Sequence, residues 1–219
     1  MNCAYKRELE KKQIDRINQQ EKDAVVYARC ICLEWLQEHG MSKKTIQKVL
    51  DEVLIFIAEA FDKYRDETEE EFDTKTVPFL TKGMQNQVDA LEIPIKEINE
   101  EYAIQPRRGM KQLTKTARYE KLKVRETAIR PYWYAFLVVL GCNHRFGKKK
   151  LTEFYRDIRA RYKADWEYYM DCTPAGDVQI SRTVKYVIES VSKTFKMDGS
   201  DGLFYEKKEL DVSNVAELK

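Results

Sequence analysis

The sequence predicts an all-α protein, built from two pseudo-repeated helix-turn-helix hairpins, a charged helical middle segment that joins them and a C-terminal amphipathic helix. Three observations support this prediction. Apolar residues recur at the three- and four-residue spacing of amphipathic helices, and 8 glycines and 5 prolines are few for 219 residues. Hydrophobic residues make up 43% of the chain, which is sufficient for a core. One apolar unit occurs twice, as residues 33–53 and 138–158.

The two copies of this unit have the sequences LEWLQEHGMSKKTIQKVLDEV and VVLGCNHRFGKKKLTEFYRDI. When they are aligned, His39 pairs with His144, and Met41 pairs with Phe146. Gly40 has the conformational freedom to end a helix, so we expect one helix to stop there and the next to begin directly afterwards. The match indicates a duplicated helix-turn-helix unit, which constrains the fold but identifies no substrate.

In the first copy, a helix is expected over residues 6–38, and Ser42 is expected to be the N-cap of the next helix. The middle of that second helix, between Val53 and Phe61, is apolar almost all round. A helix of that kind is buried either in the fold or in an oligomer interface. A homodimer formed through this helix is therefore one possible assembly.

The remaining elements are expected in the following order. The acidic run at residues 62–73 leads to short helices near residues 81–92 and 95–102. Pro106 opens a basic helical segment, and Pro131 should begin the first helix of the second copy. A last amphipathic helix precedes the sequence DGSDG near the C-terminus.

These elements divide the chain into three parts. Residues 1–65 are expected to form an N-terminal helical hairpin, and residues 66–105 an acidic linker with short helices. Residues 106–219 would contain the basic helix, the second hairpin and the C-terminal helix. The first and third parts could pack together as one compact unit.

The composition is typical of a cytoplasmic protein. The N-terminal segment lacks the apolar core of a secretory signal, and no stretch approaches the roughly 20 apolar residues that span a membrane. The five cysteines are an odd, scattered set, as expected of free thiols in a reducing compartment. The 39 basic and 37 acidic residues give a net charge of +2, so local charge matters more than the total. We expect a cytoplasmic protein that makes no membrane contact.

Signatures of catalysis and of cofactor binding are absent from the sequence. The patterns GxxxxGK[ST], GxGxxG, HExxH and CxxC do not occur, and two histidines cannot build a histidine-rich metal site. We therefore expect a non-catalytic protein with no cofactor and no bound metal. A metal-dependent nuclease whose ligands are carboxylates would leave no such pattern, and this alternative stays open.

Two surfaces are the preferred sites for a partner. The first is a basic stripe before residue 126 that suits phosphate groups, with neutralisation by the acidic run or an anionic protein partner as the alternatives. The second combines arginine and aromatic side chains, which occur at interface hot spots and base-stacking surfaces, with ordinary helix packing as the alternative. The residues of the stripe are Arg107, Arg108, Lys111, Lys115, Arg118, Lys121 and Arg125, and those of the second surface are Tyr155, Arg156, Arg159, Tyr162 and Trp166.

The first copy also matches the pattern of DNA-binding helix-turn-helix units, because Gly40 lies at the turn and Ser42 would cap the helix that enters the groove. The position four residues before the turn glycine is normally small, but it is Leu36 here. The second copy has Gly141 at that small position and Arg145 at the turn, so each copy departs at a different place. In this alternative the DNA-reading residues are Lys43, Lys44, Gln47, Lys48, Lys148 and Lys149.

Residues 140–154, LGCNHRFGKKKLTEF, resemble the helix–FGFGKKRL–helix signature of small uncharacterised proteins encoded by phages and prophages of Gram-positive bacteria. Residues 36–50, LQEHGMSKKTIQKVL, are similar to it more loosely. The resemblance implies a bacterial mobile element, whose small helical accessory proteins often bind a host protein, a defence protein or nucleic acid. We therefore expect a phage or mobile-element accessory factor that inhibits a bacterial defence complex, such as a CRISPR nuclease, by binding its protein or its nucleic acid. A helix-turn-helix DNA-binding regulator is the alternative function.

Overall fold

The computed structural model describes residues 25–68, 76–103, 115–172 and 182–195. Every regular element in these residues is a helix, which confirms the predicted all-α fold. Helical residues 25–38 come first, followed by α2 (Lys43–Thr68), α3 (Thr76–Asp89), α4 (Ile95–Glu101), α5 (Lys115–Cys142), α6 (Lys148–Cys172) and α7 (Arg182–Thr194). In this part of the chain, no helix combines the length and the apolar character needed to cross a membrane.

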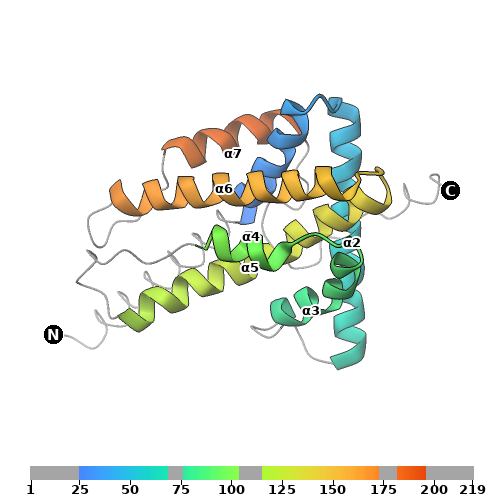
Figure 1. The fold of residues 1–219 in the computed structure, drawn as a ribbon, viewed down its shortest axis with the longest axis horizontal. Helices are drawn as coiled ribbons and strands as arrows, with labels where there is room; N and C mark the ends of the chain where they lie inside the picture. The colour runs from blue at the N-terminus through green and yellow to red at the C-terminus, as the bar shows by residue number, and fades with distance from the viewer. Residues whose placement is uncertain (1–24, 69–75, 104–114, 173–181, 196–219) are drawn as a thin grey trace, which may run out of the picture.

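Figure 1 shows α6 along the long axis of the molecule, and both α4 and α5 pack against it. At one end α2 crosses this direction, and α3 packs against both α2 and α5. Helical residues 25–38 contact α5, because the indole N–H of Trp133 donates to the carbonyl of Ala28 at 3.4 Å. They contact α6 as well, because the indole N–H of Trp35 donates to Asp157 at 2.9 Å.

The C-terminal half of α5 is the centre of the hydrophobic core. All side chains from residue 132 to residue 140 are buried, and Trp133 is fully buried. Tyr155 and Tyr162 of α6 meet the Trp133 indole edge to face, with ring centroids 6.3 Å and 5.2 Å away. Edge-to-face pairs of this kind contribute about 0.5–1.5 kcal/mol beyond the burial of their area. This half of α5 is apolar on every side because α2, α3, α6 and helical residues 25–38 surround it.

A Schellman turn ends the helix at residues 25–38 and leads into α2. Gly40 has a φ of +79°, and the N–H of Met41 donates to the carbonyl of Leu36 at 3.0 Å. The hydroxyl oxygen of Ser42 then accepts a hydrogen bond from the backbone N–H of Thr45 at 3.2 Å. Ser42 therefore caps α2, as the sequence predicts.

The turn between α5 and α6 has a similar backbone. Arg145 has a φ of +57°, and the N–H of Phe146 donates to the carbonyl of Leu140 at 3.0 Å. This bond spans one residue more than its counterpart in the first turn, so the second turn is wider. The N–H of Leu151 donates to the carbonyl of Gly147 at 3.1 Å and closes the first turn of α6. The origin of the two units by duplication stays a prediction.

Two predicted helix boundaries are wrong, namely the start at Pro131 and the short helix near residues 81–92. α5 continues through Pro131, although the sequence predicts a helix start there. A proline inside a helix costs about 3 kcal/mol, and burial of the following residues outweighs that loss. α3 begins at Thr76 and contains Pro78 and Gly83. Pro78 lies in the first turn, where its missing N–H would have no partner within the helix.

The apolar middle of α2 is only partly covered in the described structure. Val53 and Ile57 are buried in the core. The other apolar side chains of this stretch are partly buried, and they are Leu54, Ile55, Phe56, Ala58 and Ala60. A homodimer through the helix between Val53 and Phe61 stays a prediction.

Candidate functional site

The predicted basic stripe lies at the start of α5 and in the segment before it. Arg107, Arg108 and Lys111 fall outside the described residues. The other members belong to the first half of α5, at the three- and four-residue spacing that follows one side of a helix, and they are Lys115, Arg118, Lys121 and Arg125. Their part in binding stays a prediction.

The predicted arginine and aromatic surface of α6 is largely part of the core. Tyr155, Arg159 and Tyr162 are buried, and the Arg159 guanidinium lies 5.1 Å from the centroid of the Trp133 ring. Arg156 is exposed, and Trp166 belongs to the last two turns of α6. In the described structure, these three buried side chains stabilise the packing of α6 and are not available to a partner.

The structure places the loop before α6 against the N-terminal half of α2, and these are the two helices that the sequence predicts as DNA-reading. Loop residues His144 and Asn143 both contact Glu52 of α2, at 2.9 Å and 3.1 Å. The first turn of α6 therefore lies beside the N-terminal half of α2, at the end of the molecule where α2 crosses (Figure 1). We call the exposed cationic residues of these two helix starts the lysine-rich end, and they are Lys43, Lys44, Lys48, Arg145, Lys148, Lys149 and Lys150.

Few acidic groups neutralise the lysine-rich end. Lys48 pairs with Glu52 at 3.7 Å, and Lys148 pairs with Glu92 at 3.3 Å. The ammonium group of Lys150 lies 4.1 Å from the centroid of the Phe146 ring. Neither α2 nor α6 has an acidic residue in its first turn, so the positive end of each helix dipole is not offset there.

Three lysines of this end remain available for an anionic partner. Lys43, Lys44 and Lys149 are exposed, and they form no ion pair with another residue that the structure describes. Gln47 is partly buried, and its amide donates to Asp51 at 2.9 Å. In α2 the exposed lysines of the first turn precede Asp51 and Glu52, so the positive charge is concentrated at its start.

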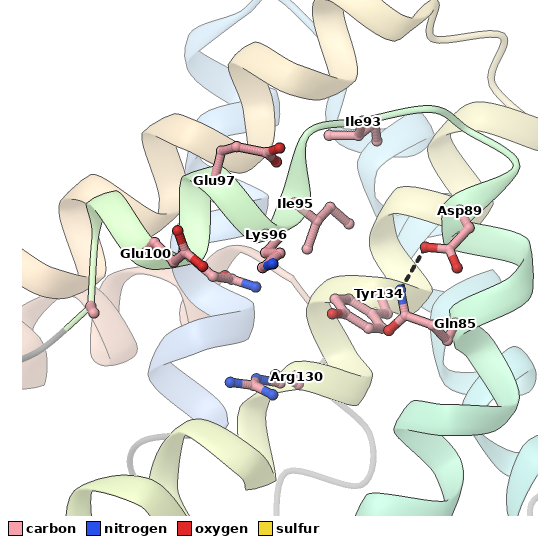
Figure 2. A pocket seen from close by; sticks show the side chains of 11 residues that line it. Gln85, Asp89, Ile93, Ile95, Lys96, Glu97, Glu100, Arg130 and Tyr134 are labelled. Carbon is pink, nitrogen blue, oxygen red and sulfur yellow. Dashed lines mark hydrogen bonds between the residues drawn. The ribbon is translucent and has the colours of Figure 1, made fainter.

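A pocket of about 530 Å³ lies between α3, α4 and α5 (Figure 2). The amide of Gln85 donates to Asp89 at its rim at 2.7 Å. Burial raises the pKa of Tyr134, so its phenol stays protonated at neutral pH. Side chains of both signs line the pocket, namely Arg130, Lys96, Asp89, Glu97 and Glu100. This mixture favours no single charge class of ligand.

A second, smaller cavity of about 230 Å³ lies between helical residues 25–38 and α6. His39 and Asp157 line it, and Glu153 is one helical turn before Asp157. The sequence does not predict this group, because His39 comes from a different helix. The sequence contains one indication of this group. Glu153 and Asp157 are four residues apart, and this spacing places both carboxylates on one side of α6.

No protein family, no curated protein and no solved structure matches this chain. The fold and the surface define an all-α protein with a lysine-rich end in the described residues.

Proposed function

We propose that this chain is a non-catalytic binding protein whose lysine-rich end binds the phosphate backbone of nucleic acid. The observation that supports this most is the contact of His144 with Glu52, which holds the loop before α6 against the N-terminal half of α2, because neither helix has an acidic residue in its first turn. Lysine ammonium groups bind phosphates as point charges, and helix N-termini add partial positive charge and backbone N–H donors.

The biological role that we propose is that of a phage or mobile-element accessory factor. Such a factor would inhibit a bacterial defence complex, such as a CRISPR nuclease, by occupying its nucleic acid or by binding the protein beside it. The resemblance of residues 140–154 to phage-encoded proteins supports the setting, and the lysine-rich end supports the nucleic-acid contact.

Salt dependence tests the proposed contact. The full chain is titrated against a labelled random DNA duplex and the matching RNA duplex, with anisotropy as the measurement. Each phosphate contact contributes a slope of about −0.9 to the dependence of log K on log salt for duplex DNA. We expect binding at low salt and a slope that corresponds to several contacts. The absence of binding at low salt would contradict the proposal.

The proposed role in defence requires a separate experiment. The tagged chain is incubated with a bacterial lysate, with and without nuclease treatment, and the retained proteins are identified by mass spectrometry. If the chain binds the complex through nucleic acid, a defence complex should be retained from the untreated lysate and lost after nuclease treatment. Retention that survives nuclease treatment would indicate a protein contact, and retention of no specific component would contradict the accessory role.

A helix-turn-helix regulator of transcription is the alternative function. The Schellman turn at Gly40 and the cap by Ser42 favour it, because DNA-binding units of this class use such a turn. Asp51 and Glu52 oppose it, since both are acidic and lie in the N-terminal half of the helix that would enter the major groove. Selection from a pool of random duplexes separates the two functions. A regulator would enrich one sequence, whereas phosphate binding alone would enrich none.

A further inference from the structure

Three potential metal ligands lie together where the first described helix ends beside α6. They are His39, Glu153 and Asp157, and one ligand atom from each lies within 4.8 Å of those from the other two. We propose that these residues bind one divalent transition-metal ion. The proposal is independent of the lysine-rich end.

The orientation of the His39 ring is compatible with metal binding. Its Nδ1 lies 2.8 Å from the carbonyl oxygen of Trp35, which can only accept a hydrogen bond. Nδ1 therefore carries the proton, and the lone pair of Nε2 is left for a cation. Metal-binding histidines commonly have their second ring nitrogen fixed in this way. The Trp35 indole also stacks on the imidazole, with centroids 3.6 Å apart and planes at 16°.

The same tryptophan holds the second ligand. The indole N–H of Trp35 donates to Oδ2 of Asp157 at 2.9 Å, so the other carboxylate oxygen is left for a cation. Trp35 is 5% exposed and also packs edge to face on Phe154, so its position is fixed by the core. One buried side chain thus orients ligands from two different helices.

The charge at the cluster suits a divalent ion. Arg161 lies 2.5 Å from Glu34 and 3.8 Å from Glu38, so these neighbouring acids have a partner. Glu153 and Asp157 form no ion pair with a described lysine or arginine. Two carboxylates and one neutral imidazole would supply two negative charges. One nitrogen and two oxygen donors are a set that Zn²⁺, Mn²⁺ and Co²⁺ accept.

The geometry requires only a small contraction. Ligands about 2.1 Å from a tetrahedral ion lie about 3.4 Å from one another. Glu153 is exposed and is not held by Trp35, so its side chain can rotate toward the other two ligands. Three protein ligands leave a further coordination position, and the cavity of about 230 Å³ beside His39 and Asp157 can hold water or a small ligand there.

Metal titration of the full chain tests the site. The protein is first dialysed against a chelator and then titrated with CoCl2 by visible absorption and with ZnCl2 by calorimetry. We expect one ion per chain and a higher Tm with metal, because a ligand that binds only the folded state stabilises it. The variants H39Q and D157N should bind at least about tenfold more weakly, while H144Q, which changes the other histidine, should bind like the unaltered chain.

The variant W35F tests whether Trp35 strengthens metal binding by orienting the ligands, although it is not itself a ligand. It keeps an aromatic ring beside His39 but removes the donor to Asp157, and we expect binding about tenfold weaker at the same stoichiometry. Melting curves without metal identify any variant that fails to fold. No saturable binding of one ion by the unaltered chain, or equal affinity in H39Q and H144Q, would overturn the proposal.

Discussion

Gly40 and Arg145 both adopt the left-handed backbone conformation, with φ values of +79° and +57°, at aligned positions of the two helix connections. Glycine enters this conformation without a steric penalty, whereas other residues lose about 1–2 kcal/mol. The first turn therefore has the residue that its backbone favours, and the second does not.

Removal of the glycine at position 40 and introduction of a glycine at position 145 should change the free energy of unfolding in opposite directions. We expect Gly40→Ala to lower it by about 1 kcal/mol, because alanine is strained at a positive φ. Arg145→Gly should raise it by up to about 1 kcal/mol, because the strain is removed. Equilibrium unfolding in urea measures both changes.

Gly83→Ala is the matched control for this comparison. Gly83 is inside α3, and a Cβ there would meet no atom within 4 Å. Alanine should therefore stabilise this helix by about 1 kcal/mol. If Gly40→Ala also stabilised the protein, the left-handed conformation of the first turn would be refuted.

Gly141 allows α5 to approach the loop after α3. A Cβ at this position would lie 2.8 Å from Cδ2 of Leu91 and 3.2 Å from Cδ1 of Leu151. We expect Gly141→Ala to destabilise the protein by about 1 kcal/mol through overpacking, in spite of the better helix propensity of alanine. In a Leu91→Ala background the same change should be neutral or stabilising. Equal effects in both backgrounds, measured by thermal unfolding, would rule out this contact as the cause.

Tyr155 stabilises the packing of α6 through its hydroxyl group, which donates to the side-chain oxygen of Asn99 at 2.7 Å. Tyr155→Phe should lower the free energy of unfolding by about 1 kcal/mol, because Asn99 loses its partner. Tyr186 is 71% exposed, and Tyr186→Phe should have no measurable effect. Binding of nucleic acid should be the same in both variants, and a loss of binding in Tyr155→Phe alone would place Tyr155 in the partner surface.

The cysteines should differ in their reaction with iodoacetamide. Burial raises the pKa of the Cys30 thiol to about 12 and raises that of Cys32 as well, so both stay protonated and unreactive at mildly alkaline pH. Cys142 is exposed. Mass spectrometry of the folded protein should show labelling at Cys142 and none at Cys30 or Cys32, and all should react in denaturant. Rapid labelling of Cys30 in the folded chain would contradict its burial.

Local signals in the sequence predict the all-α class and the first turn correctly. The glycine and serine at positions 40 and 42 act over a few residues, so their effect can be inferred without the fold. Pro131 shows the limit of such signals, because its place inside α5 depends on the burial of the residues that follow. Local propensity is overridden when tertiary packing contributes more.

The candidate sites depend on contacts that are distant in the sequence. Arginine and aromatic residues are typical of both interfaces and cores, and only the position of Trp133 shows that Arg159 and Tyr162 belong to the core. The cluster at His39 was missed because Trp35 and Asp157 are 122 positions apart. The lysines of the two helix starts were predicted as one alternative, but the contact between α2 and the loop before α6 could not be inferred from spacing.

The salt dependence of DNA binding by a charge-reversal variant is the most direct test of the proposed function. The variant changes Lys43, Lys44 and Lys149 to glutamate, and the matched control changes the exposed lysines Lys82, Lys96 and Lys193 in the same way. We predict that the first variant binds more weakly and that its slope of log K against log salt falls by about 1 for each phosphate that the protein no longer binds. The control carries the same net charge and should keep the slope of the unaltered chain. An equal decrease of affinity and slope in both variants, or no decrease in either, would contradict binding through the lysine-rich end.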